Sequence, residues 1–378
     1  MQKIPLEEMQ TFIVKKTKRI AEQAGDRLPS GTTGSGKLKY TENCGWTGGF
    51  WTGLLYYCYL LTGDTSFFDL ADKSRFRFLN RLYQTPETLD QDVGFLYIPS
   101  EYARYKLQGK AESRKVVLDA AESMLSRYVP KGRYILAWND WGDGTEVSLY
   151  NKSRIIIDSM YNLPLLYWAS QETGETRFAD AASAHAETCS KTLVREDGTT
   201  FHTYIFDLET GAPKFGKTFQ GYSDDSCWAR GQTWALGGFA MAYRFTGNPA
   251  FLEVSKKTAD VYLDLLEPDY IPVWDFIFKG QDVPRDASAA AIAASGLLEL
   301  ASHCTGDEKE RYQNAAKQMV LALWNGYTSR NDADFNALIE RCVGFHESES
   351  YEFGENVIYA DYYFAEAVAK LKGLEAIL

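Results

Sequence analysis

The chain has 378 residues, of which 45% are hydrophobic, and its formal net charge is −11. This length allows a large buried core, and the negative charge argues against nucleic acid and anionic membranes as partners. No segment has the pattern of a signal peptide or the length of an apolar membrane span. We therefore expect a cytoplasmic protein that binds neither nucleic acid nor a membrane.

The six cysteines are scattered and form no CxxC pair, which is typical of reduced thiols in the core of a cytosolic protein. The four histidines form no HxH or HxxxH pattern. A metal site built from histidine and cysteine is therefore not expected, and nothing else in the sequence calls for a cofactor. Aromatic residues reach 14%, which fits either a sugar-binding cleft or a core of large helices.

The chain repeats one local plan: a polar or aromatic start, an apolar helix, a glycine turn and a second, more charged helix. Glycine suits the left-handed residue that ends a helix, and the acidic or amide residue after it suits the next start. The expected turns contain Gly63, Gly109, Gly174, Gly247 and Gly306. The second helices are expected over Phe67–Leu82, Lys115–Tyr128, Arg177–Leu193, Phe251–Leu265 and Glu310–Trp324.

An additional helix at each end of the chain brings the count close to six hairpins. Because the terminal helices can pair with each other, we favour a closed ring over an open solenoid. The predicted fold is all-α: an (α/α)6 barrel of six inner and six outer helices, with short β-hairpins in loops, forming one domain over residues 1–378. One hairpin should pair Thr199–Asp207 with Phe215–Phe219, and Tyr134–Trp138 should form another short strand.

Asp158 stands in an apolar stretch between Ile157 and the Leu163–Trp168 run. Burial raises the pKa of a carboxyl, and an acid that stays protonated near neutral pH can act as a general acid. The alternative is a helix N-cap, for which aspartate is also favoured. The repeat places other special residues at the same end of the inner helices, so we expect all of them at one mouth: Trp46, Asp92, Asp158, Arg230 and Asp286.

Five segments together carry a resemblance to a known family: Gly45–Trp51, Asp92–Phe95, Arg154–Asp158, Trp228–Trp234 and Arg285–Ala289. From about Leu28 to Leu371 the chain resembles glycoside hydrolase family 88, the unsaturated glucuronyl hydrolases. The resemblance implies the barrel fold and removal of a non-reducing-end 4,5-unsaturated glucuronic acid from oligosaccharides made by polysaccharide lyases. Such enzymes hydrate the C4=C5 double bond, and glycosaminoglycan-type disaccharides are the expected substrates.

The resemblance also implies roles for individual residues. Asp158 would protonate C4 and then help water attack C5, and Asp92 would be the second essential carboxylate. Gln91 stands where the family pattern has histidine, which puts one hydrogen bond to the substrate, or the protonation of the aspartate pair, in doubt. The remaining implied contacts are Trp46, Trp138 and Trp234 as walls of the sugar site, and His202, Gln220 and Arg230 as ligands of the uronate.

Structural readings of the same residues remain open. Asp92 suits a helix cap, the tryptophans suit a core, and His202 suits a strand as a satisfied structural residue. Arg230 has Asp224 and Asp225 as possible ion-pair partners. We expect Asp286 to be structural and to hold Arg285 or a neighbouring loop.

Three other functions fit the pattern less well. An unsaturated rhamnogalacturonyl hydrolase would share the fold and the chemistry. A sugar epimerase would need paired histidines at the mouth, and a non-enzymatic helical scaffold would use the aromatic residues to bind protein. The sequence leaves a monomer and a homodimer equally open.

The loop after Phe345 carries Glu347, Glu349, Glu352 and Glu355 with no lysine or arginine. By resemblance this region lies near the reducing-side sugar. A sulfate would meet like charge there if the glutamates face the cleft, whereas solvated glutamates would have no effect. The first case predicts a preference for unsulfated substrates.

Overall fold

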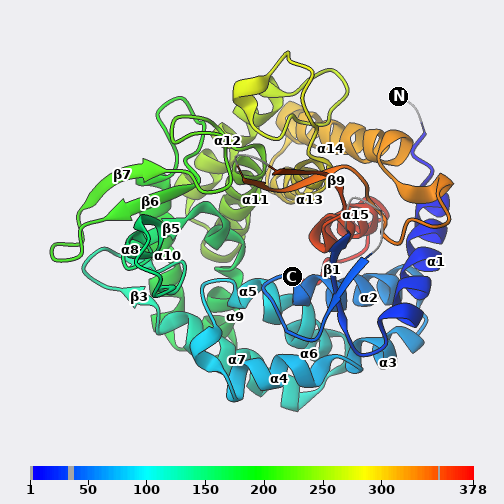
Figure 1. Cartoon of the computed structure of the whole chain (residues 1–378), viewed down its shortest axis with the longest axis horizontal. Helices are drawn as coiled ribbons and strands as arrows, with labels where there is room; N and C mark the ends of the chain where they lie inside the picture. The colour runs from blue at the N-terminus through cyan, green and yellow to red at the C-terminus, as the bar shows by residue number, and fades with distance from the viewer. Residues whose placement is uncertain (1–2, 33–37, 348–349) are drawn as a thin grey trace.

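The computed structural model of the chain describes residues 3–32, 38–347 and 350–378. Within these residues, two concentric rings of helices surround one axis (Figure 1). The inner ring consists of α2 (Gly48–Thr62), α5 (Val93–Tyr97) with α6 (Ala103–Gln108), α9 (Pro164–Thr173), α11 (Ala229–Thr246), α13 (Ala287–Ser302) and α15 (Ile358–Leu371). The outer ring consists of α1 (Leu6–Ala24), α3 (Ser66–Asp72) with α4 (Arg75–Tyr83), α7 (Ala111–Leu125), α10 (Thr176–Thr192), α12 (Pro249–Leu265) and α14 (Gly306–Gly326).

The ring is closed by helices from the two ends of the chain. The last inner helix, α15, packs on the first, α2, and α1 covers both from outside. In Figure 1 the blue N-terminal helices therefore lie beside the red α15. The fold is an (α/α)6 barrel, as the sequence predicts.

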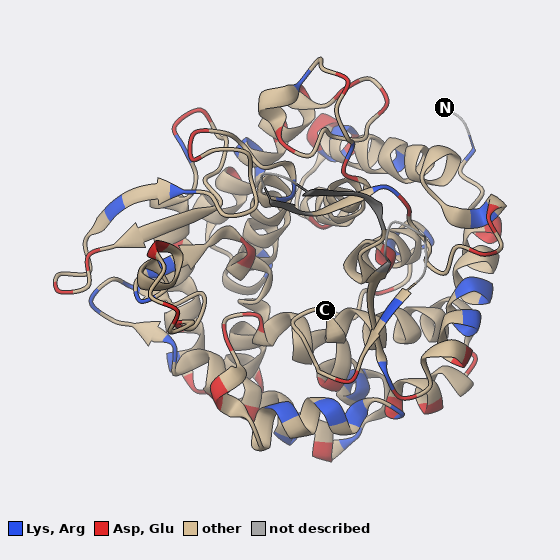
Figure 2. Cartoon of the chain, in the orientation of Figure 1, with Lys and Arg blue, Asp and Glu red and all other residues tan. Residues whose placement is uncertain are grey.

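Inner and outer helices differ in the way their side chains are buried. Nearly every residue of α13 is buried, and its alanine-rich sequence suits a helix surrounded by others. The outer helix α10 buries only one face. Charged residues accordingly gather on the outer helices and the loops (Figure 2).

Two glycines let the segment that follows Asp92 pack closely between its neighbours. A Cβ on Gly49 would lie 2.1 Å from the carbonyl oxygen of Phe95, and a Cβ on Gly94 would lie 2.6 Å from the Cα of Asn162. Neither position can accept a side chain without movement of the backbone. The start of α5 is thus fixed against α2 on one side and against the turn after Asp158 on the other.

Four of the five predicted turn glycines end inner helices. Gly63, Gly109, Gly174 and Gly247 all have left-handed φ angles of 66–76°. The prediction for Gly306 is wrong in detail, because α13 ends at Ser302 and Gly306 is the first residue of α14.

Small antiparallel sheets lie in the loops, and their strands are β1 (Leu28–Thr32), β2 (Leu38–Thr41), β3 (Tyr128–Val129), β4 (Tyr134–Ile135), β5 (Arg154–Ile156), β6 (Thr203–Phe206), β7 (Pro213–Lys217), β8 (Cys342–Glu347) and β9 (Ser350–Glu355). The predicted pairing of β6 with β7 is confirmed. The sequence did not predict that β5, which leads to Asp158, pairs with β6 to make three strands. The strand expected over Tyr134–Trp138 is limited to Tyr134–Ile135.

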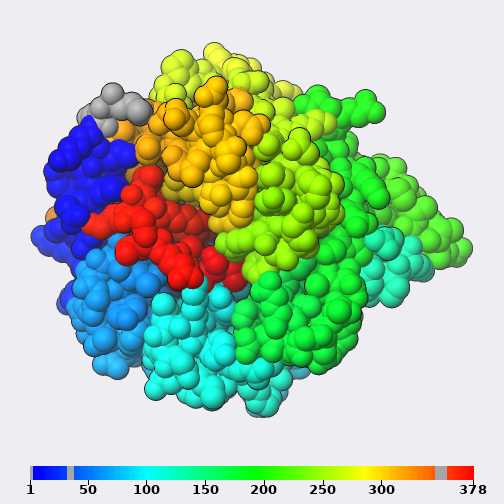
Figure 3. Space-filling model, turned by 180° about the vertical axis from the view of Figure 1, so that it is seen from behind, coloured from blue at the N-terminus to red at the C-terminus, as the bar shows by residue number. Residues whose placement is uncertain are grey.

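Short helical turns complete the loops: η1 (Pro86–Thr88), η2 (Ile98–Tyr102), η3 (Ile157–Tyr161), α8 (Glu146–Tyr150), η4 (Phe276–Phe278) and η5 (Ser329–Asn331). The η2 turn is a π-helix that contains Pro99, whose missing N–H interrupts the helix between α5 and α6. At the back of the barrel, the C-terminal residues lie between the N-terminal helices and α14 (Figure 3). No helix in the described part of the chain is long and apolar enough to cross a membrane.

Candidate active site

A cleft of about 510 Å³ opens where the loops lead into the inner helices. Five of the predicted site residues line it: Trp46, Asp92, Trp138, Asp158 and Gln220. The others lie deeper, since Gln91, His202, Arg230 and Trp234 are all buried. The structure thus brings the predicted residues together at one mouth of the barrel, in two layers. The five residues that line the cleft form the surface layer, and the four deeper residues form a supporting layer beneath it.

Asp158 lies on η3, directly after strand β5, and is only 8% exposed. Burial raises the pKa of its carboxyl to about 7, although Arg230 and the indole of Trp234 act in the opposite direction. It is the second residue of η3, whose N-cap position is Ile156, so the N-cap alternative is wrong. Asp158 is therefore a carboxyl at the cleft that is half protonated near neutral pH.

His202 faces Asp158 with a defined tautomer. Its Nδ1 accepts hydrogen bonds from the backbone N–H groups of Phe219 and Gln220, at 3.0 and 3.1 Å. The proton of the neutral ring must then be on Nε2, which lies 3.8 Å from Oδ2 of Asp158. Burial lowers the pKa of His202 well below its ordinary value, and Arg154 and Arg230 act in the same direction. His202 is thus a neutral donor.

The two atoms that face each other, Asp158 Oδ2 and His202 Nε2, are buried and have no hydrogen-bond partner among the described residues. Their separation is too long for a direct hydrogen bond. Both polar atoms therefore lack a partner among the described residues, although they lie beneath the surface of the cleft.

Asp92 is the second buried carboxyl of the cleft. Burial raises its pKa well above the ordinary value, and the neighbouring charges of Asp90 and Asp158 raise it further. Its Oδ1 accepts hydrogen bonds from Gln91 Nε2 at 2.7 Å and from Asn162 Nδ2 at 3.4 Å. Gln91 is completely buried, so it acts on Asp92 and does not line the cleft.

Asp90 is a cleft residue that the sequence reasoning missed. It lines the same cleft as Asp92 and Asp158, and its Oδ1 accepts the backbone N–H of Asp92 at 2.9 Å. Burial raises its pKa as well. The sequence shows aspartates on both sides of Gln91, and this spacing could have indicated that Asp90 lies at the cleft with Asp92.

Aromatic side chains form a wall of the cleft. Trp138 and Trp141 are stacked, with ring centroids 6.1 Å apart and an interplanar angle of 28°, and Phe219 contacts both. The sequence reasoning also missed Trp141, which is 49% exposed at the edge of the cleft. A large aromatic ring that remains exposed beside a cleft is suited to stack on a sugar.

Trp46 lines the cleft and packs on Tyr359, with ring centroids 5.3 Å apart. Trp234 is only 1% exposed and packs on Tyr161 and Phe95, so it belongs to the supporting layer. Its buried indole nitrogen makes no hydrogen bond of ordinary geometry in the described part of the chain, but it lies near enough to Asp158 to act on the pKa of that carboxyl.

Arg230 is paired with a different residue from those expected. Its Nη1 lies 2.9 Å from Asp286, and it donates to the carbonyls of Val343 and Gly344, both at 2.6 Å. The proposed pairing with Asp224 or Asp225 is therefore wrong, because both guanidinium NH2 groups are bound to Asp286 or to these carbonyls. The new partner lies on a distant helix that local sequence cannot reveal.

Asp286 is structural, as expected. It caps α13 by accepting the N–H of Ser288, and it holds the neighbouring β8–β9 hairpin by accepting the N–H of Val343. Its ion-pair partner is Arg230 and not Arg285. Arg285 lies 3.6 Å from Asp269.

Within the residues that the structure describes, no group of three or more His, Cys, Asp and Glu side chains could hold a metal ion. The glutamates expected to oppose a sulfate belong to the 345–355 stretch, which lies outside the residues whose side chains are described.

The model of Glycosyl Hydrolase Family 88 matches residues 16–373, nearly the whole chain. The chain belongs to this family. The unsaturated glucuronyl hydrolase of Bacillus sp. (strain GL1) is 38% identical over 94% of this chain and 94% of its own length. The unsaturated chondroitin disaccharide hydrolase of Streptococcus pneumoniae (strain ATCC BAA-255 / R6) is 36% identical over 91% of this chain and 86% of its own length.

Solved structures agree with the sequence match. The unsaturated glucuronyl hydrolase of Streptococcus agalactiae superposes with a TM-score of 0.93 at 32% identity, and the alignment covers 100% of this chain and 94% of that one. This family 88 member is therefore a glycoside hydrolase, and the scaffold and epimerase alternatives are set aside.

Proposed function

We propose that the protein removes a 4,5-unsaturated glucuronic acid from the non-reducing end of oligosaccharides made by polysaccharide lyases. The observation that carries this proposal is Asp158, a buried carboxyl with a pKa of about 7 in a cleft that also holds Asp92. Two lines of likeness support it. Relatives are named unsaturated glucuronyl or chondroitin disaccharide hydrolases, and a form of the Streptococcus agalactiae enzyme was solved with dGlcA-GalNAc6S.

The proposed reaction adds water across the C4=C5 double bond. Protonated Asp158 transfers its proton to C4, and positive charge develops at C5 and the ring oxygen. A water molecule then attacks C5 while the ionised Asp158 accepts a proton from it, which restores the acid. The resulting hemiketal opens as its bond from C5 to the ring oxygen breaks, which gives a C5 ketone and leaves a hydroxyl group on C1. The C1 hemiacetal then collapses to an aldehyde, and the aglycone leaves with a hydroxyl group.

The second carboxylate has an electrostatic role in this scheme. Asp92, when ionised, stabilises the positive charge at C5, and its bond from Gln91 favours that ionised form. Because no leaving group is displaced directly, the separation of the two carboxyls does not predict inversion or retention.

The substrate contacts remain part of the proposal. The neutral Nε2–H of His202 and the amide of Gln220 bind the uronate, and Arg230 contributes positive charge from the layer beneath. Trp46 and Trp138 contact the faces of the sugars, and Trp234 supports them from below. Cytoplasmic location, a monomer or homodimer, and independence of metal ions stay predictions from the sequence.

The decisive experiment follows the loss of ultraviolet absorbance of the conjugated double bond across a panel of unsaturated disaccharides. Asp158→Asn should lower kcat by several powers of ten, because the amide can neither donate nor accept the proton. Asp361→Asn is the matched control, since Asp361 is also buried with a pKa raised to about 7 but lies outside the cleft.

Activity of Asp158→Asn within tenfold of the parent enzyme would contradict the assignment. A rhamnogalacturonan-derived disaccharide in the same panel tests the alternative substrate. Turnover of that compound alone would replace glucuronyl with rhamnogalacturonyl specificity.

A further inference from the structure

Two arginines bind consecutive carbonyl groups directly before the acidic Asp90–Asp92 segment. Arg81, on α4, donates from Nη2 to the carbonyl of Thr88 at 2.9 Å. Arg127, just after α7, donates from Nη1 to the carbonyl of Leu89 at 3.3 Å. The backbone just before the segment that carries two cleft carboxyls is therefore held by hydrogen bonds from two guanidinium groups.

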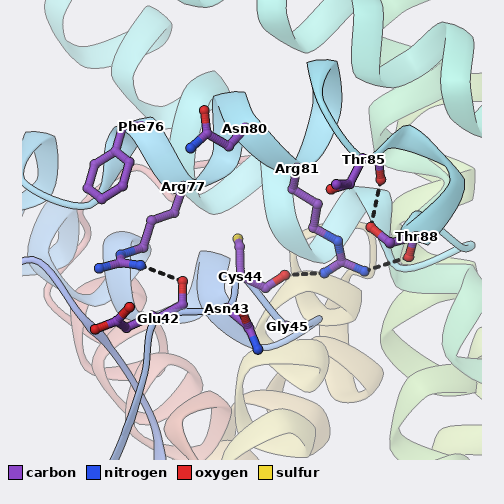
Figure 4. A pocket seen from close by; sticks show the side chains of 10 residues that line it. All are labelled: Glu42, Asn43, Cys44, Gly45, Phe76, Arg77, Asn80, Arg81, Thr85 and Thr88. Atoms are coloured by element: carbon purple, nitrogen blue, oxygen red, sulfur yellow. Dashed lines mark hydrogen bonds between the residues drawn. The ribbon is translucent and has the colours of Figure 1, made fainter.

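Each arginine also binds the loop of another cleft residue. Arg81 donates from Nη1 to the carbonyl of Cys44, two residues before Trp46 (Figure 4). Arg127 donates to the carbonyls of Leu136 and Ala137, at 2.9 and 3.0 Å, next to Trp138. The two side chains thus link three cleft-forming segments that are distant in sequence.

The same arginines carry charge close to the carboxyls. Burial raises the pKa of both Asp90 and Asp92, and the charges of Asp90 and Asp158 raise that of Asp92 further. Arg81 opposes this rise for both residues, and Arg127 opposes it for Asp90. An arginine that bound only backbone carbonyls far from Asp90 and Asp92 would not lower the pKa of these carboxyls.

We propose that Arg81 and Arg127 are positioning residues for the reaction: they hold the Asp90–Asp92 segment in register with the Trp46 and Trp138 loops and place positive charge beside its carboxyl groups. Neither arginine lines the cleft itself, so neither touches the substrate. The effect on catalysis rests on the proposed function, whereas the effect on the segment does not.

Arg77 provides a matched control from the same helix and the same outer pocket (Figure 4). Like Arg81 it binds backbone, namely the carbonyls of Glu42 and Asp26. Within the described residues, its hydrogen bonds do not reach the 85–92 segment, and it is not among the main charges that act on Asp90 and Asp92.

The first test compares Arg81→Gln with Arg77→Gln in hydrogen-exchange mass spectrometry of the full chain. Both variants should accelerate exchange near residues 42–45, but only Arg81→Gln should accelerate it over 85–92. Equal exchange over 85–92 in both variants would overturn the proposed linkage, whatever the substrate is.

The second test measures the pH profile of kcat/KM on an unsaturated disaccharide that the parent enzyme hydrolyses. Arg81→Gln should lower kcat/KM by about tenfold or more and move the acid limb to higher pH, because the carboxyls then take up protons more easily. Arg81→Lys should recover part of the activity, since it keeps the charge but can bind fewer carbonyls.

Arg127→Lys should likewise move the acid limb to higher pH. The lysine ammonium can bind fewer carbonyls than the guanidinium, so its positive charge is held less firmly beside Asp90. The proposal would be overturned if the acid limb of the pH profile did not move in either Arg81→Gln or Arg127→Lys and activity fell only in proportion to the folded fraction. Both arginines would then have only a structural role. A parent enzyme inactive on every unsaturated disaccharide would instead contradict the proposed function and leave the exchange result to decide the linkage.

Discussion

Asp158 and His202 are both held in their neutral forms by the same cause, which is removal from water. Burial raises the pKa of the acid and lowers that of the imidazole, so near neutral pH neither group carries a full charge. A protonated carboxyl can deliver a proton to carbon, and a neutral imidazole with its proton on Nε2 can donate a hydrogen bond. The pair therefore suits a reaction that begins with protonation of the substrate.

These shifts predict a bell-shaped pH dependence of kcat/KM. Activity should fall above about pH 7, where Asp158 loses the proton it must donate, and fall again at low pH, where the Asp90–Asp92 pair becomes protonated. Initial rates from about pH 5 to pH 9 at constant ionic strength measure both limbs. A rate that stays level from neutral to alkaline pH would contradict the role of Asp158 as the acid.

Trp141 predicts a contact with sugars beyond the uronate. From Asp158 the site runs through His202 and Trp138 to Trp141, the most exposed of the four. Trp141→Ala should raise KM about 2- to 10-fold, as expected for loss of one aromatic contact, and more for a tetrasaccharide than for a disaccharide. Leu149→Ala removes an equally exposed apolar side chain away from the cleft and is the control. Equal KM changes in both variants would count against a Trp141 contact.

At the scale of elements, the turn that carries Asp158 is fixed from behind by the outer helix α10. Nδ1 of His185 accepts the N–H of Ile135 at 2.9 Å, so its proton is on Nε2, which lies 2.9 Å from Oγ of Ser159. Ser159 in turn donates to the carbonyl of Ile156. One buried imidazole therefore joins α10, the start of the Trp138 loop and the turn that carries Asp158.

Replacing this imidazole should weaken both the fold and the reaction. His185→Phe leaves the N–H of Ile135 without its acceptor, and a buried unsatisfied group costs about 1–3 kcal/mol. We expect a loss of that size in denaturant unfolding, and a larger fall in kcat than in the folded fraction. Ser159→Ala, which removes one of the two bonds, should have a smaller effect. A fully active His185→Phe protein of parental stability would refute the link.

Local patterns predicted the elements well where the cause was local. Four turn glycines end inner helices because the left-handed conformation is a property of the residue itself. The partner of Arg230 was not predictable, because Asp286 lies on another helix and only the folded ring brings the two together. His185 gave no signal for a related reason, since a histidine on the buried face of an amphipathic helix resembles any core residue.

For the whole molecule, the repeat of hairpins predicted the closed ring, because the helices at the two ends of the chain can pair with each other, as α15 and α2 do. The depth of each site residue was not predictable. Trp46 and Arg230 occupy similar places in their repeats, since each lies 17 residues before its turn glycine, yet Trp46 lines the cleft and Arg230 lies beneath it. That difference arises from the packing of all the loops at the mouth.

The charge of the whole molecule leads to a prediction about sulfated substrates. The net charge is −11, and the β8–β9 hairpin contains Gly344, which lines the cleft. Its sequence from 345 to 356 contains four glutamates and no lysine or arginine. An added sulfate should therefore meet a negative potential near the reducing-side sugar.

We expect a higher kcat/KM for an unsulfated disaccharide than for its partner with a sulfate on the amino sugar. Added salt should narrow the difference, because screening weakens repulsion between groups in contact with water. Rates for the matched pair at low and high ionic strength measure both effects. If the preference for the unsulfated disaccharide does not change with salt, the enzyme discriminates by shape and not by charge. A preference for the sulfated disaccharide would contradict the prediction and show that this end of the cleft attracts anions despite the charge of the molecule.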